Sequence, residues 1–283
     1  MNESRNDDQA KAGVTAPNES TFFWSGLGRK NGSISERGIA AKAAPTVSIR
    51  VLTAMALVLT PLTAAQAEDA PSANFKFTLG AYKFSENGTG IDANLRHSSD
   101  YGNAWVGYFR APKLDANQWR GGWDKTFGES VRIQPSVQVA SGGFVGGSIN
   151  IETGDSWFVG AGFGRTNLRP YFNLNFDPND SWMLAGGYRA ESGQSFAATY
   201  IRDNRENPDQ QHFHFTSRTP LEGKERLTLD LLYKRGIVDG QRIAKVGGTV
   251  TYDWPRYFVR LAFDPNTNFT ADNVWRLSVG TRF

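Results

Sequence analysis

The chain has 283 residues, no cysteine and a net charge of +3. The lack of cysteine excludes a disulfide framework and a thiolate metal site, and the small net charge without a basic run argues against nucleic-acid binding. A mean hydropathy of −0.46 with a single apolar run excludes a bundle of transmembrane helices, which needs several runs of about 20 apolar residues. The 30 Gly, 19 Phe, 9 Tyr and 8 Trp instead suit strands joined by tight turns.

Residues 50–67 have the pattern of a secretory signal peptide. Arg50 precedes a short apolar run, and an Ala-Gln-Ala motif ends it at Ala67. This order of basic, apolar and small residues predicts cleavage after Ala67, whereas the run is too short for a transmembrane anchor. Residues 1–49 are polar and without periodicity, so we expect a disordered leader or a start codon assigned too far upstream.

Residues 68–283 form one series of predicted strands. Apolar and polar side chains alternate there with period two, which is typical of strands with one face in each of two environments. The alternation is clearest in residues 131–139, 227–233, 246–254 and 257–263. We count about fifteen candidate strands of about ten residues, the length with which a tilted strand crosses a lipid layer.

Turn-forming residues separate these strands. Gly, Asn, Asp and Pro supply the positive or fixed φ of tight turns, and they gather at residues 86–90, 98–102, 128–130, 153–156, 177–180, 191–193, 207–209, 222–223, 239–240 and 264–266. A closed bacterial barrel needs an even strand number. The fold prediction is therefore all-β, a single antiparallel transmembrane β-barrel of 14 strands, with 12 as the second choice. Aromatic residues near strand ends favour it over a soluble β-sandwich.

The connections between the candidate strands are short. None exceeds roughly a dozen residues, whereas barrels of this class usually carry long loops on one side. We therefore expect no plug and no constriction loop, so that any selectivity comes from side chains of the wall.

The chain ends in WRLSVGTRF, in which Trp275, Leu277, Val279, Thr281 and Phe283 share one face. This tail resembles the C-terminal strand of Gram-negative outer-membrane β-barrel proteins, where a terminal aromatic residue is read by the barrel-assembly machinery. The resemblance implies a location in the cell outer membrane, contact with its lipid and lipopolysaccharide, and Phe283 as the assembly signal. It matches no functional subfamily and leaves the oligomeric state open.

His97 and Ser99 have a spacing that resembles that of outer-membrane lipid hydrolases, in which a His base activates a Ser nucleophile. Strand order places this pair at the periplasmic rim, however, and such enzymes work at the outer leaflet. No Asn, Asp or Glu is found where the third member of such a site is needed. His97 and Ser99 are therefore weak catalytic candidates, and we predict neither an enzyme nor a cofactor.

His212 and His214 share one face of a predicted strand and could bind zinc. A zinc site needs three or four protein ligands, and the sequence offers no evident third. We therefore expect two wall histidines in a wet lumen and no metal. Gly160, Gly162 and Gly164 lack the helix that follows a dinucleotide-binding fingerprint, and they indicate a bare inner wall.

Alternation assigns many charged side chains to the interior. If the apolar face contacts lipid, the lumen-lining residues are Arg96, Arg132, Gln134, Arg189, Arg218, Arg226, Asp230, Lys245, Asp253, Arg260 and Arg276, together with Asp92. Unpaired arginines would attract anionic solutes, whereas arginines paired with acidic neighbours would form a salt-bridged interior. Arg132 is the sharpest case, because its own strand carries no acidic residue on that face.

Three functions follow from these patterns. The leading hypothesis is a passive channel for small hydrophilic solutes, with a preference for anionic ones. The main alternative is a non-conducting structural or envelope-interaction barrel with a salt-bridged interior. A lipid hydrolase of the outer membrane is the third.

Overall fold

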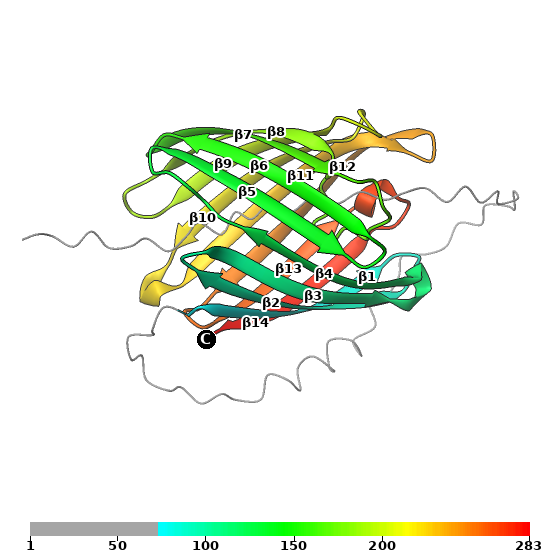
Figure 1. Ribbon diagram of the computed structural model, residues 1–283, viewed down its shortest axis with the longest axis horizontal. Coiled ribbons are helices and arrows are strands. Elements are labelled where there is room, and N and C mark those ends of the chain that lie inside the picture. Colours follow the sequence, from blue (N-terminus) through cyan, green and yellow to red (C-terminus); the bar gives the residue numbers. More distant parts are fainter. Residues whose placement is uncertain (1–72) are drawn as a thin grey trace, which may run out of the picture.

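The computed structural model describes residues 73–283, so the predicted leader (1–49), the signal peptide (50–67) and its cleavage site at Ala67 lie outside the described residues. Fourteen strands form one antiparallel sheet, and β1 (Phe75–Phe84) pairs with β14 (Val274–Arg282) to close it (Figure 1). The prediction of a closed 14-strand antiparallel barrel is confirmed. Within residues 73–283, no helix has the length and hydropathy needed to cross a lipid bilayer.

Every strand pairs with its neighbours in chain order, so short turns connect most of them. The strands between β1 and β14 are β2 (Thr89–Ser99), β3 (Gly102–Ala111), β4 (Ala116–Asp124), β5 (Val131–Ala140), β6 (Phe144–Thr153), β7 (Trp157–Thr166), β8 (Ser181–Arg189), β9 (Ser195–Asp203), β10 (Gln211–Pro220), β11 (Arg226–Val238), β12 (Gln241–Asp253) and β13 (Tyr257–Asp264). Three single-turn 3₁₀ helices are η2 (Pro112–Leu114), η3 (Glu222–Lys224) and η4 (Thr267–Phe269). We call the end where β1 begins and β14 ends the terminal rim, and the other end the distal rim.

The two faces of the wall differ in polarity. On β5, for example, Val131, Val137 and Val139 are exposed on the outer face, while Gln138 is buried on the inner face. The same outward exposure of large apolar side chains recurs around the ring, at Leu79, Ile91, Val106, Ile149, Val159, Leu184, Phe215, Leu231, Val250, Leu261 and Trp275. An apolar outer wall of this extent is what a lipid layer covers.

The seam of the barrel is closed by both backbone and side chains. The Phe75 N–H donates to the Phe283 carbonyl at 2.9 Å, and the Phe283 N–H donates back to the Phe75 carbonyl at 3.0 Å. Their rings stack with centroids 5.7 Å apart. Phe283 therefore completes the last pairing of the ring.

The prediction that all connections are short is wrong for residues 167–180, which join β7 to β8. It contains a long infolded segment in which Tyr171, Asn173, Leu174 and Phe176 are buried. Residues 171–176 alternate as a strand would, yet they form none. The expectation of no constriction loop fails because period-two alternation does not distinguish a wall strand from an extended loop that packs against the wall.

Candidate functional site

Residues 167–180, hereafter the inner loop, cross the lumen. Gln118 on β4 holds the Phe172 backbone twice, donating from Nε2 to its carbonyl at 3.1 Å and accepting its N–H on Oε1 at 2.8 Å. Arg276 on β14 donates from Nη1 to the Leu174 carbonyl at 2.9 Å. Because β14 lies opposite β7 in the ring of strands, the inner loop spans the lumen from one wall to the other.

Apolar packing fixes the middle of the inner loop. Leu174 and Phe176 form one buried cluster with Tyr82 and Phe84 of β1, Phe109 and Ala111 of β3, and Val274 of β14. The ring of Phe172 stacks on that of Phe109 with centroids 4.8 Å apart. Burying a large apolar side chain contributes about 1.5–3 kcal/mol. The hydrophobic effect therefore holds the inner loop against the β1, β3 and β14 side of the wall.

Asp180 returns the inner loop to the wall at the distal rim. Thr166, the last residue of β7, donates from Oγ1 to Asp180 Oδ2 at 2.6 Å. Arg205, in the next connection at the same rim, donates from Nη1 to Asp180 Oδ1 at 3.1 Å. Both ends of the inner loop are thus tied down.

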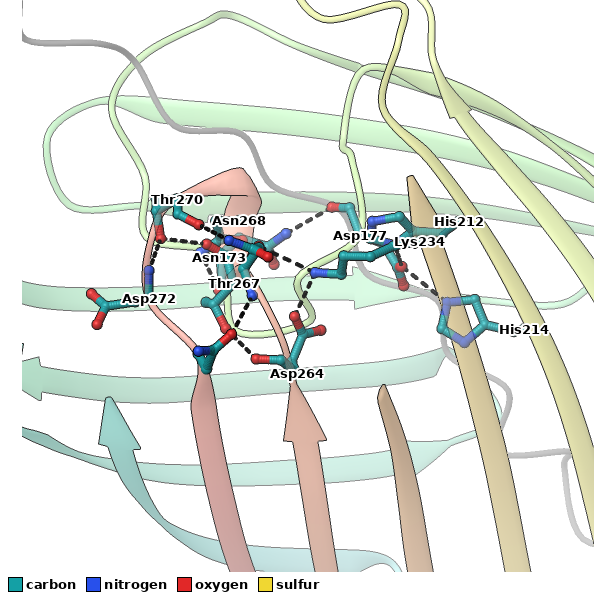
Figure 2. Close-up of polar contacts among 12 residues, drawn as sticks. Asn173, Asp177, His212, His214, Lys234, Asp264, Thr267, Asn268, Thr270 and Asp272 are labelled. Atoms are coloured by element: carbon teal, nitrogen blue, oxygen red, sulfur yellow. Dashed lines mark hydrogen bonds and ion pairs between the residues drawn. The ribbon is translucent and has the colours of Figure 1, made fainter. Parts of the chain in front are cut away.

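Asp177 connects the inner loop to β10. Its Oδ1 lies 2.6 Å from His212 Nδ1 and 3.1 Å from His214 Nε2 (Figure 2). His214 Nδ1 in turn lies 2.9 Å from Oδ1 of Asp230 on β11. Burial alone would raise the pKa of Asp177, but the charge of His214 and the hydrogen bonds of both rings hold this pKa below its usual value.

The surroundings of the two histidines differ from the expected wet wall. His212 is fully buried, and Asp177 supplies the third group that the sequence did not reveal. No sequence signal points to Asp177, because it comes from a loop whose path depends on packing rather than on periodicity.

A second buried pair lies beside these residues. Lys234 on β11 is fully buried and donates from Nζ to Asp264 Oδ1 at 2.5 Å (Figure 2). The connection that follows β13 also contacts the inner loop, since Asn268 donates from Nδ2 to the Asn173 carbonyl at 3.0 Å. Two connections, together with the wall residues that hold them, therefore lie inside the distal half of the lumen.

The inner face near the terminal rim has a different character. Basic side chains outnumber acidic ones there: Lys76, Arg96, Arg132, Arg189, Arg218, Arg226, Arg260 and Arg282 accompany Asp124, Glu152 and Asp253. Glu152 contacts both Arg132 and Arg189 at 2.7 Å. Asp253 contacts Arg282 at 2.5 Å and Arg226 at 3.4 Å. These acidic groups are shared, so basic side chains are in excess on this part of the inner face.

The expectation that no acidic side chain lies beside Arg132 is wrong. Glu152 on β6 is its cross-strand partner, and it accepts from both Nε at 3.0 Å and Nη2 at 2.7 Å of Arg132. The pair was missed because a single strand shows its own neighbours, whereas this neighbour is set by the register of the next strand. Alternation within β6, where Ile149 and Ile151 point outward, places Glu152 on the inner face and could have revealed it.

The other residues assigned to the lumen also have contacts in the structure. Arg96 lies 3.6 Å from Asp124, Gln134 donates to Asp124 at 3.2 Å, and Asp92 pairs with Arg120 at 2.5 Å. Arg260 donates from Nε to Thr251 Oγ1 at 3.1 Å. Arg218 shares the inner face of β10 with His212 and His214. Lys245 is exposed near the distal rim, beyond the last residue of β12 that pairs with β13.

His97 and Ser99 lie at the terminal rim. The His97 ring packs on Phe75 with centroids 4.6 Å apart. Ser99 donates from Oγ to the Gly102 carbonyl at 3.1 Å and accepts the Tyr101 N–H at 3.3 Å. The His97 contact therefore joins β2 to β1, and the Ser99 contacts stabilise the turn between β2 and β3.

No protein-family model and no curated protein matches this chain. Among solved structures, the outer membrane protein Omp33 of Acinetobacter baumannii is 11% identical with a TM-score of 0.49, covering 75% of this chain and 98% of that one. The NanC porin is 7% identical (TM-score 0.42; 73% and 100% covered), and the KdgM porin is 12% identical (TM-score 0.41; 74% and 99% covered). The solved structures to which this chain is similar are thus outer-membrane β-barrels.

Proposed function

We propose that the chain forms a passive channel for small hydrophilic solutes in the outer membrane. The observation that carries this proposal is the opposite polarity of the two faces of a closed wall, apolar outside and charged inside. A closed sheet has no unpaired edge, so it can sit in lipid while its inner face stays polar. In this proposal lipid and lipopolysaccharide contact the outer face, and the barrel-assembly machinery inserts the chain.

The inner loop sets the size limit of this channel. It crosses the lumen between β7 and β14 and is held on Gln118, Arg276 and the apolar cluster. A solute must pass beside it, so the passage is narrower than the strand number alone suggests. Because the passage is narrow, we expect that only small solutes pass and that the single-channel conductance is low.

The charge near the terminal rim favours anionic solutes. The excess of basic side chains there lies inside a wall of low dielectric constant, which focuses the potential and raises the local concentration of anions. The pairs at Glu152 and Asp253 reduce this potential without cancelling it, because each acidic group is shared by two arginines.

A non-conducting barrel is the second candidate. It is favoured by the buried apolar cluster, in which Leu174 and Phe176 of the inner loop pack against inward side chains of three strands. If that packing seals the lumen, the barrel serves as a structural or envelope-interaction element.

Planar-bilayer recording of refolded residues 68–283 separates the two. We expect discrete low-conductance steps, with a reversal potential in a salt gradient that indicates anion preference. A matched variant replaces residues 170–178 with a Gly-Ser linker, and its conductance should increase several-fold because the passage widens. If the wild type does not conduct but the variant does, the inner loop seals the barrel. If neither conducts although both are folded, the channel proposal is refuted.

A further inference from the structure

Asp177, His212 and His214 form a compact set of metal-binding groups. One ligand atom from each lies within 4.8 Å of the others. The two imidazoles come from one face of β10 and the carboxylate comes from the inner loop (Figure 2). Tetrahedral zinc with N and O ligands at about 2.0–2.2 Å places its ligand atoms about 3.3 Å apart. Small side-chain rotations would therefore bring this set to that spacing.

Two further features point to a ligand at this set. His214 uses its second ring nitrogen, Nδ1, on Asp230, whose Oδ2 accepts from Thr216 Oγ1 at 2.6 Å. A carboxylate that fixes the far nitrogen of a histidine is the usual support of a metal-binding imidazole. In addition, His212 is fully buried and presents Nδ1 to the same Asp177 oxygen, Oδ1, that His214 Nε2 faces.

We propose that Asp177, His212 and His214 bind one divalent transition-metal ion of the zinc class, and that this ion fastens the inner loop to β10. Two imidazoles and one carboxylate suit Zn²⁺ better than Mg²⁺ or Ca²⁺, which prefer oxygen ligands alone. Three protein ligands leave one position for water.

The ion has a structural consequence that the apolar cluster does not supply. Leu174 and Phe176 hold the inner loop against β1, β3 and β14, whereas Asp177 is its contact with β10. A metal bond at Asp177 would fix the inner loop at both walls. With the ion removed, the Asp177 carboxylate would keep its hydrogen bonds to the two rings, but no metal bond would hold the loop to β10.

Isothermal titration of ZnCl₂ into the untagged, refolded barrel tests the site directly. We expect one ion per chain, with no comparable binding of MgCl₂. Asp177→Asn and His214→Ala should each weaken zinc binding at least tenfold, and His97→Ala, which removes a histidine at the other rim, should leave it unchanged. Folding of each variant is checked by its heat-dependent migration in SDS gels. Absence of zinc binding to the wild type, or equal binding by Asp177→Asn, would overturn the proposal.

A spin label tests the fastening of the inner loop. The chain has no cysteine, so Asn175→Cys, at an exposed position of the inner loop, gives a single labelling site. Zinc should reduce the mobility of this label, EDTA should restore it, and the response should vanish when Asp177→Asn is added. Zinc binding without any change in mobility would refute the fastening. Neither readout depends on conduction, so a failure here is distinct from a failure of the proposed channel.

Discussion

Glu152 accepts hydrogen bonds from Arg132 on β5 and Arg189 on β8, so one carboxylate holds two strands that are not neighbours. Asp253 does the same with Arg226 and Arg282. Sharing of this kind stabilises the wall and leaves a positive surplus near the terminal rim. At the scale of single residues, the interior therefore combines the two alternatives that alternation left open, a salt-bridged wall and a cationic one.

Substitution of Arg218 and Arg260 tests whether the excess of basic side chains on the inner face near the terminal rim sets ion preference. We expect the double substitution Arg218→Ser with Arg260→Ser to shift the reversal potential toward cations, since two positive charges leave the inner wall. Arg235→Ser is the matched control, because Arg235 contacts Gln211 on the other face of the wall. An unchanged reversal potential in the double variant would mean that ion preference is set elsewhere in the lumen.

At the scale of elements, the inner loop is the longest connection among the described strands, and it folds inward. Three of its contacts reach the wall inside the lumen: backbone hydrogen bonds to Gln118 and Arg276, apolar packing on β1, β3 and β14, and the carboxylate of Asp177 on β10. The contact on β10 lies on a strand that the other two do not use. Loss of any one should loosen one part of the loop without unfolding the barrel.

Leu174→Ala with Phe176→Ala removes the apolar contacts of the inner loop. Large-to-small changes at buried positions cost about 2–5 kcal/mol each, which exceeds the small free energy that usually holds a loop closed. Amide hydrogen exchange of residues 167–180 should accelerate at least tenfold, while strands β4 and β14 keep their protection. Leu79→Ala, on the exposed outer face, is the control and should leave the exchange of the inner loop and of both strands unchanged. Equal protection of the inner loop in both variants would show that the apolar cluster does not hold it.

At the scale of the whole molecule, closure depends on one seam between the first and last strands. Phe283 makes the final pair with Phe75 through two backbone hydrogen bonds and a ring stack. Every other strand pair is formed by strands that are consecutive in the chain, but β1 and β14 lie at opposite ends of the barrel sequence, so their pairing carries the cost of closing the whole ring.

Removal of Phe283 should lower the yield of the barrel in the outer membrane several-fold, because the last rung of the seam and the exposed terminal ring are lost together. The measurement is the amount of heat-modifiable protein in the membrane fraction. Phe283→Tyr, which keeps an aromatic ring, is the control and should retain the yield. A normal yield from the shortened chain would exclude Phe283 as an assembly signal.

The sequence by itself determined the class of fold and the two faces of its clearest strands, because these depend on a local period of two and on turn residues, whereas the choice of 14 strands also needed the rule that closed barrels have an even number. The assignment of Arg276 and Asp230 to the interior required no more than that. Only the tertiary structure decided which charges meet, as with Arg132 and Glu152, because partners depend on the register between strands. It also decided the path of the inner loop, since long-range packing and not periodicity brings Asp177 to His212 and His214.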